Sequence, residues 1–154
     1  MDYDLFLNTK LDVMSLGDLL SKMLSGILNE EIKCVKVRSE LGYHYLYVNG
    51  KYFTIHIELD DEDREEYREM NARYHYVDTN IHISVQLLSK TFEIGWLKLL
   101  ELIGRLLKAI AGDILLLDDC SFSVMKRKNS ITLVNTNLDE YRIKYITREN
   151  LKKF

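Results

Sequence analysis

One apolar helix followed at once by closely spaced strands is the feature that most constrains this chain. Between Phe92 and Ala111 large apolar residues recur at helical spacing, with charged residues on the opposite side. The apolar positions are Trp96, Leu99, Leu100, Ile103, Leu106, Leu107 and Ile110. We expect a core helix with one exposed face, capped by Thr91 and ended by Gly112 in a left-handed conformation. Three short apolar runs follow and predict a meander of strands: Ile114 to Leu117, Phe122 to Met125 and Ile131 to Val134.

A strand and a second amphipathic helix are predicted at the start of the chain. Tyr3 to Thr9 alternates apolar and polar residues, which is typical of a half-buried strand. Ser15 is the expected N-cap of the helix that follows, and Asn29 its expected end. Its buried face is predicted to hold Leu16, Leu19, Leu20, Met23, Leu24, Ile27 and Leu28.

From Ile32 the apolar period changes to two, and aromatic and β-branched residues become frequent. Asn49-Gly50 predicts a hairpin with a type I′ turn, because both central residues of that turn need positive φ. After an acidic segment, the alternation resumes from Tyr74 to Leu87, as one strand or as a strand broken near residues 78–80. The strands predicted before the acidic segment are 34–38, 43–48 and 52–57.

The sequence therefore predicts a single α+β domain over residues 1–154. We expect the order β-α-β-β-β-β-α-β-β-β, with a mostly antiparallel sheet covered on one face by two helices. The other face of the sheet should carry the polar alternates, including Lys36, Arg38, His44 and His56. The tail from Leu138 to Phe154 is expected to form a short helix or an irregular segment.

Charge and composition exclude several classes of protein. The formal net charge is −3, and no wide basic face is apparent, which argues against nucleic-acid binding. We interpret Lys126-Arg127-Lys128 as a hairpin tip that aids solubility. The sequence has neither a membrane span nor an N-terminal signal pattern, so we expect a cytoplasmic protein with no membrane partner. Cys34 and Cys120 are predicted to be small buried hydrophobic residues.

No catalytic constellation is recognisable, and we expect neither a cofactor nor enzymatic activity. A Gly-x-Ser-x-Gly elbow and a phosphate-binding glycine loop are both absent. Asp118-Asp119 is interpreted as turn chemistry between two strands. One alternative remains open: His56 and His82, on adjacent strands, could form a metal pair in a small metal-binding protein or enzyme.

The acidic segment from Glu58 to Glu69 is the most informative polar feature. It is predicted to be a short exposed helix or a mobile loop. A carboxylate cluster raises the association rate for a basic partner, and tyrosines supply contact area at low entropic cost. The predicted partner-binding residues are Asp60, Asp61, Glu62, Asp63, Glu65, Glu66, Tyr67, Glu69, Tyr45 and Tyr74.

Both ends of the chain resemble a known group of proteins. A long helix ending at Gly112-Asp113 leads into Ile-Leu-Leu-Leu, an acidic turn, Ser-Val-Met-Lys-Arg and then Ser-Ile-Thr-Leu-Val-Asn135. This pattern, with the opening strand before a leucine-rich helix, resembles small bacterial immunity proteins of polymorphic toxin systems, notably those paired with swarm-inhibition toxins. The resemblance implies a cytoplasmic antidote that binds and blocks a cognate toxin domain, with no catalysis of its own. The acidic segment predicts that this partner is basic. A non-catalytic adaptor subunit is the other alternative.

Overall fold

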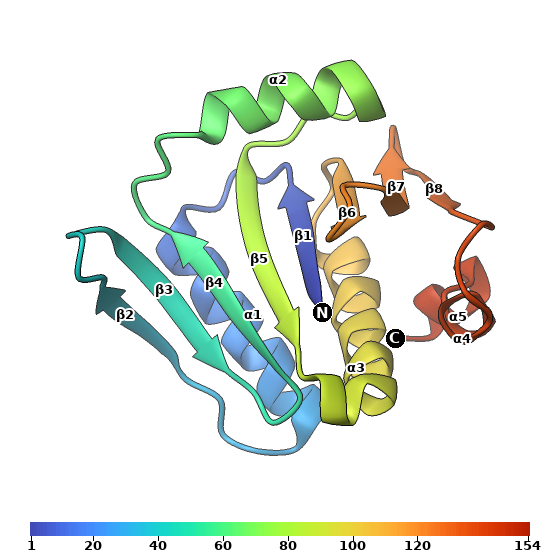
Figure 1. Cartoon of the computed structure of the whole chain (residues 1–154), viewed down its shortest axis with the longest axis horizontal. Helices are drawn as coiled ribbons and strands as arrows, with labels where there is room; N and C mark the ends of the chain where they lie inside the picture. The colour runs from blue at the N-terminus through green and yellow to red at the C-terminus, as the bar shows by residue number, and fades with distance from the viewer.

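The computed structural model describes all residues from 1 to 154, which form an α+β fold around one open antiparallel sheet (Figure 1). The eight strands lie in the order β2-β3-β4-β5-β1-β6-β7-β8. Their bounds are β1 Asp2–Leu7, β2 Cys34–Arg38, β3 His44–Asn49, β4 Phe53–Glu58, β5 Ile81–Leu87, β6 Ile114–Asp118, β7 Ser123–Lys128 and β8 Ile131–Val134. The first strand pairs with β5 on one side and β6 on the other, so it joins the two halves of the chain at the centre of the sheet.

Two long helices cover one face of the sheet, as the sequence predicts (Figure 1). They are α1 (Val13–Leu28) and α3 (Phe92–Ala109), the latter preceded by a short 3₁₀ turn, η1 (Ser89–Thr91). Two short helices, α4 (Glu140–Tyr145) and α5 (Arg148–Lys153), form the tail, and α5 packs beside α3. None of the helices combines the length and the apolar content needed to span a bilayer.

The apolar alternates of the strands meet the apolar stripes of α1 and α3 in one main core. Tyr3, Leu5 and Leu7 of β1 point into it, and the Tyr3 ring lies 5.4 Å from the ring of Trp96 on α3. Each leucine removed from water here contributes roughly 1.5–3 kcal/mol. The predicted core helix is therefore confirmed.

The helix ends differ in part from the prediction. The N-cap of α1 is Asp12, whose carboxylate accepts a hydrogen bond from the Ser15 amide at 2.8 Å, so the expected Ser15 cap is wrong. Asn29 does end α1, with φ of 52°. Gly112 is not a left-handed cap, because α3 ends at Ala109 and Gly112 has no positive φ. A Cβ at Gly112 would lie 2.1 Å from the Asn8 carbonyl oxygen, so this glycine permits a close backbone approach.

The two-residue type I′ turn lies in a different hairpin from the one predicted. Residues Asn49 and Thr54 pair directly, but neither Asn49 nor Gly50 has positive φ, so this hairpin has a longer loop. Asn129 and Ser130, which join β7 to β8, have φ of 49° and 68°, as a type I′ turn requires. Lys126-Arg127-Lys128 consequently belongs to β7 itself, and Arg127 is buried rather than exposed at a tip.

The acidic segment forms a helix that is longer than expected. Helix α2 (Arg64–His75) runs past the acidic residues, and Tyr76 ends it with φ of 58°. The prediction of a strand from Tyr74 is therefore wrong, and His75 lies on a helix. The inner side of α2 packs on the second face of the sheet, where Tyr67 covers a small cluster of Phe6, Val77, Leu115 and Leu117. That face, which we call the open face, is thus partly covered.

Several polar residues that were predicted to lie on the open face lie on the other face of the sheet, as the strand register shows. Lys36 lies opposite Leu46, and Arg38 lies opposite His44. These three polar residues therefore share the face of the buried Leu46, at the exposed end of the sheet, because directly paired residues point to the same side. His56 does lie on the open face, opposite Tyr47 and Ser84. Both cysteines are free, but Cys34 is only half-buried and Cys120 is exposed in a turn.

Candidate functional site

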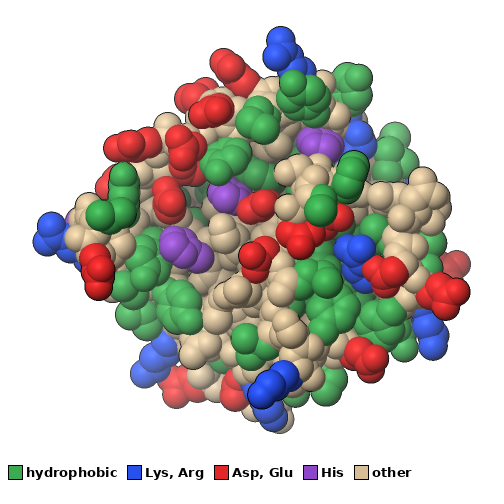
Figure 2. All heavy atoms as spheres, viewed as in Figure 1, with side chains coloured by type: hydrophobic (Ala, Val, Ile, Leu, Met, Phe, Trp, Pro, Cys, Tyr) green, Lys and Arg blue, Asp and Glu red, His purple; other side chains and the backbone are tan.

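A hollow of about 300 Å³ lies on the open face beneath the start of α2. Eight residues line it, and we call it the acidic hollow: Asp4, His56, Glu58, Asp61, Asp63, Tyr67, His82 and Ser84. Four carboxylates and two imidazoles thus share one concavity that no lysine or arginine lines. In the space-filling view, acidic side chains gather over the start of α2 and the end of β4, beside the histidines (Figure 2).

The alternation of three strands places these side chains together. Tyr3 and Leu5 of β1 point into the core, so Asp4 between them points to the open face. The same rule turns His56 and Glu58 of β4, and His82 and Ser84 of β5, toward the hollow. The connection from β4 to α2 then brings Asp61 and Asp63 to the hollow, and α2 itself contributes Tyr67.

His82 belongs to a cluster of three rings at the back of the hollow. Its ring stacks on Phe6 with centroids 4.6 Å apart, Tyr67 lies 4.8 Å from it, and the Phe6 and Tyr67 rings are 5.6 Å apart. The His82 Nε2–H donates a hydrogen bond to Asp4 Oδ1 at 2.7 Å. Burial raises the pKa of the Tyr67 hydroxyl, and the neighbouring carboxylates, Asp63 first, raise it further. Tyr67 is therefore a neutral hydrogen-bond donor that also anchors α2 to the sheet.

His56 forms the second imidazole wall. Its ring stacks on Tyr45 at a centroid distance of 4.1 Å, which brings Tyr45 to the edge of the hollow. Burial lowers the pKa of His56; the carboxylate of Glu58 opposes that shift, whereas His82 adds to it. The neutral, stacked form of His56 is thus favoured in the folded protein.

The remaining acidic residues form a second surface on the outside of α2. Glu62, Glu65, Glu66 and Glu69 recur at helical spacing, and we call them the outer acidic stripe. All four are exposed, as is Asp60 in the connection before the helix. Glu66 and Glu69 also border a shallow hollow with Met70 and Tyr74, which are 46% and 63% exposed.

None of the acidic residues between Glu58 and Glu69 forms an ion pair. Arg68, on α2, pairs instead with Asp78, which follows the helix, at 2.8 Å. Glu65 and Glu66 lie in the first turn of α2, where the helix dipole stabilises negative charge by about 0.3–1 kcal/mol. The dipole stabilises the first turn, and most of the negative charge remains uncompensated.

The structure divides the predicted partner-binding residues into two sets. Asp61, Asp63 and Tyr67 line the acidic hollow, and Tyr45 stacks on its His56. The outer acidic stripe, Asp60 and Tyr74 face solvent. The prediction missed Asp4 and Ser84, and it treated His82 only as a possible metal ligand. Strand alternation was the available signal for Asp4, but its position beside His82 depends on pairing between residues 78 positions apart.

The arrangement offers little support for a metal centre at the two histidines. The one group of three potential ligands with donor atoms within 4.8 Å of one another is Asp118, Asp119 and Cys120. In that turn, Asp118 Oδ1 accepts hydrogen bonds from the Cys120 and Phe122 amides at 2.9 and 3.0 Å, which is turn chemistry. His56 and His82 have no third ligand at comparable spacing, and their rings are engaged in stacking.

Comparison with protein-family models, characterised proteins and solved structures gave no match for this chain.

Proposed function

We propose that this protein is an immunity protein, which binds a basic toxin domain through the acidic hollow and the outer acidic stripe and thereby blocks it. One observation carries the proposal: the carboxylates between Glu58 and Glu69 gather in the acidic hollow and along the outer acidic stripe, and none has an ion-pair partner within the chain. The resemblance of both chain ends to immunity proteins supports the same reading. The protein would act by occupying the toxin's surface, with no chemistry of its own.

The hollow and the stripe would contribute in different ways. Long-range attraction to the outer acidic stripe speeds the encounter, because exposed like charges create a field over the surface. The acidic hollow can then accept a lysine or arginine side chain between Asp4, Glu58 and Asp61, where the Tyr67 hydroxyl oxygen would accept a hydrogen bond and its ring would provide an aromatic surface. Its volume of about 300 Å³ accommodates one such side chain with its water.

The first experiment mixes this protein with the toxin domain encoded by the neighbouring gene. We expect a one-to-one complex on size exclusion at micromolar concentration and loss of toxin activity in the mixture. A failure to form any complex under these conditions would refute the proposal.

The second experiment tests the surface. The variant carrying Glu62→Lys, Asp63→Lys, Glu65→Lys and Glu66→Lys should associate about tenfold more slowly, with a smaller change in dissociation rate. The matched control reverses four acids elsewhere and changes the net charge equally: Asp18, Glu30, Glu31 and Glu149. Circular dichroism checks that α2 persists. Equal slowing in both variants, or an association rate independent of ionic strength, would show that this surface does not steer binding.

A further inference from the structure

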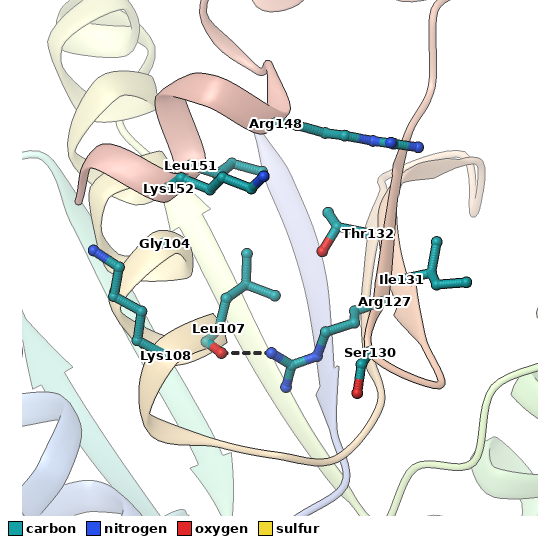
Figure 3. A pocket seen from close by; sticks show the side chains of 10 residues that line it. All are labelled: Gly104, Leu107, Lys108, Arg127, Ser130, Ile131, Thr132, Arg148, Leu151 and Lys152. Atoms are coloured by element: carbon teal, nitrogen blue, oxygen red, sulfur yellow. Dashed lines mark hydrogen bonds between the residues drawn. The ribbon is translucent and has the colours of Figure 1, made fainter.

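A second pocket lies on the other face of the sheet, between α3, α5 and the β7–β8 hairpin (Figure 3). Its volume is about 410 Å³. Its polar lining consists of basic and hydroxyl side chains, and we call it the cationic pocket: Lys108, Arg127, Arg148, Lys152, Ser130 and Thr132. It shares no residue with the acidic hollow.

The charge of this pocket is unusual for an acidic protein. Four basic side chains line it and no carboxylate does, although the chain as a whole carries a net charge of −3. In Figure 3 the basic groups come from three sides: Lys108 from α3, Arg148 and Lys152 from α5, and Arg127 from β7. Like charges gathered in one concavity repel one another unless an anion enters.

Two of the four basic groups already have structural partners. The guanidinium of Arg127 donates to the carbonyl oxygens of Leu107, Ile110 and Gly112, and Lys108 donates to the Phe154 carbonyl. Arg148 and Lys152 have neither a hydrogen bond nor a salt bridge within the chain. They occupy positions i and i+4 of α5, a spacing at which like charges destabilise a helix. These two side chains are therefore free to bind a ligand.

The β7–β8 hairpin adds two hydroxyl groups to the pocket, at different places. Ser130, which adopts φ of 68° in the type I′ turn, lies beside Arg127, on the opposite side of the pocket from Arg148 and Lys152 (Figure 3). Thr132 lies between Ser130 and Arg148, and its hydroxyl has no hydrogen-bond partner within the chain. The free hydroxyl nearer to the unpaired cations is therefore that of Thr132.

We propose that the cationic pocket binds a small organic phosphate. Arg148 and Lys152 would pair with the phosphate oxygens, and the hydroxyl of Thr132 would donate a hydrogen bond to one of them. Inorganic phosphate alone would leave most of the volume empty, whereas Leu107, Ile131 and Leu151 supply an apolar wall for an organic group. The site is independent of toxin binding.

Phenyl phosphate is a suitable probe, because it combines the anion with an apolar ring. In phosphate-free buffer, titration followed by ¹⁵N–¹H NMR should give submillimolar affinity, with shifts centred on α5 and the β7–β8 turn. Inorganic phosphate and benzoate should each bind at least tenfold more weakly. Absence of binding at 10 mM phenyl phosphate, or shifts centred elsewhere, would overturn the proposal. Benzoate that binds as tightly as phenyl phosphate would show that the pocket does not select a phosphate group.

Variants separate a built site from general attraction to positive charge. The double variant Arg148→Gln, Lys152→Gln should bind phenyl phosphate at least tenfold more weakly. The control Lys144→Gln, Lys153→Gln removes the same charge from exposed residues of the same tail outside the pocket, and it should change affinity less than twofold. Equal losses in the two variants would refute a specific site.

A single substitution gives a sharper test. Thr132→Val removes the hydroxyl and keeps a side chain of similar size, so the affinity for phenyl phosphate should fall two- to tenfold. Affinity unchanged by Thr132→Val would remove Thr132 from the site, and unchanged affinity in the Arg148, Lys152 variant as well would overturn the proposal.

Discussion

Replacing Arg127 by methionine tests how the end of the core helix is held. Arg127 is 7% exposed and lies on β7, yet its guanidinium reaches the carbonyl oxygens of Leu107, Ile110 and Gly112, where α3 ends. The last carbonyls of a helix have no partner within the helix. Methionine keeps most of the apolar stem and removes only the donors.

The expected loss follows from two opposing contributions. A hydrogen bond from a charged donor contributes about 1.5–3 kcal/mol, so three acceptors together set an upper limit of about 9 kcal/mol. The opposing contribution is the desolvation of the buried guanidinium, which lowers the pKa of Arg127 and costs several kcal/mol. No carboxylate forms an ion pair with Arg127 to offset this cost. We therefore expect Arg127→Met to lower the free energy of unfolding by about 2–4 kcal/mol.

Urea unfolding followed by fluorescence of Trp96, the only tryptophan and fully buried on α3, measures this change directly. For a chain of this length the loss corresponds to a fall in melting temperature of about 6–12 °C. Lys128→Met, on the same strand but half-exposed, is the control and should change stability by about 0.5 kcal/mol or less. Arg127→Lys should recover only part of the loss, because an ammonium cannot reach three carbonyls at once. Stability of Arg127→Met within about 0.5 kcal/mol of the parent protein would refute the reasoning.

Two further predictions concern glycines and pH. Gly112→Ala should destabilise the protein by about 3 kcal/mol, because the new Cβ would lie 2.1 Å from the Asn8 carbonyl oxygen. Gly26→Ala, on an exposed turn of α1, should stabilise the protein by about 0.5–1 kcal/mol. Thermal unfolding of both variants measures these changes, and equal effects would contradict the packing argument. Burial lowers the pKa of His56, so the unfolded chain binds its proton more readily and stability should fall as pH drops below about 6.5. His56→Gln should flatten that pH dependence between pH 5 and 7, and an unchanged slope would assign it to other groups.

The local pattern of the sequence was sufficient for most elements of the fold. The stripe of α3 and the period-two runs of the strands reflect which side chains the core excludes from water, so helix, sheet and faces follow from them. The same logic failed at α2. That helix buries little besides Tyr67 and Asn71, so no apolar stripe marks it, and Tyr74 and Tyr76 mimic strand alternation although the first lies on the helix and the second ends it.

The candidate site was predictable only in part, because its geometry depends on strand order. Alternation alone turns Asp4 and His82 to one face, but neither residue carries a signal that β1 inserts between β5 and β6. The basic side of the molecule was missed for a similar reason. Arg127 is the middle residue of Lys126-Arg127-Lys128, three charges that in sequence suggest an exposed hairpin tip. Only the position of the Asn129-Ser130 turn shows that the three residues belong to a strand, in which alternation buries Arg127.

A net charge of −3 conceals a separation of charge across the sheet. The unpaired carboxylates lie around α2 on the open face, and the basic side chains of the cationic pocket lie on the other face. A basic partner is attracted to the first and repelled by the second, so the field orients the encounter as well as speeding it. Because the two sites lie on opposite faces and share no residue, occupation of one should leave the affinity of the other within about twofold, a coupling of about 0.4 kcal/mol or less. Measuring partner affinity with and without saturating phenyl phosphate tests this, and a larger coupling would mean that the sheet between the sites transmits a structural change.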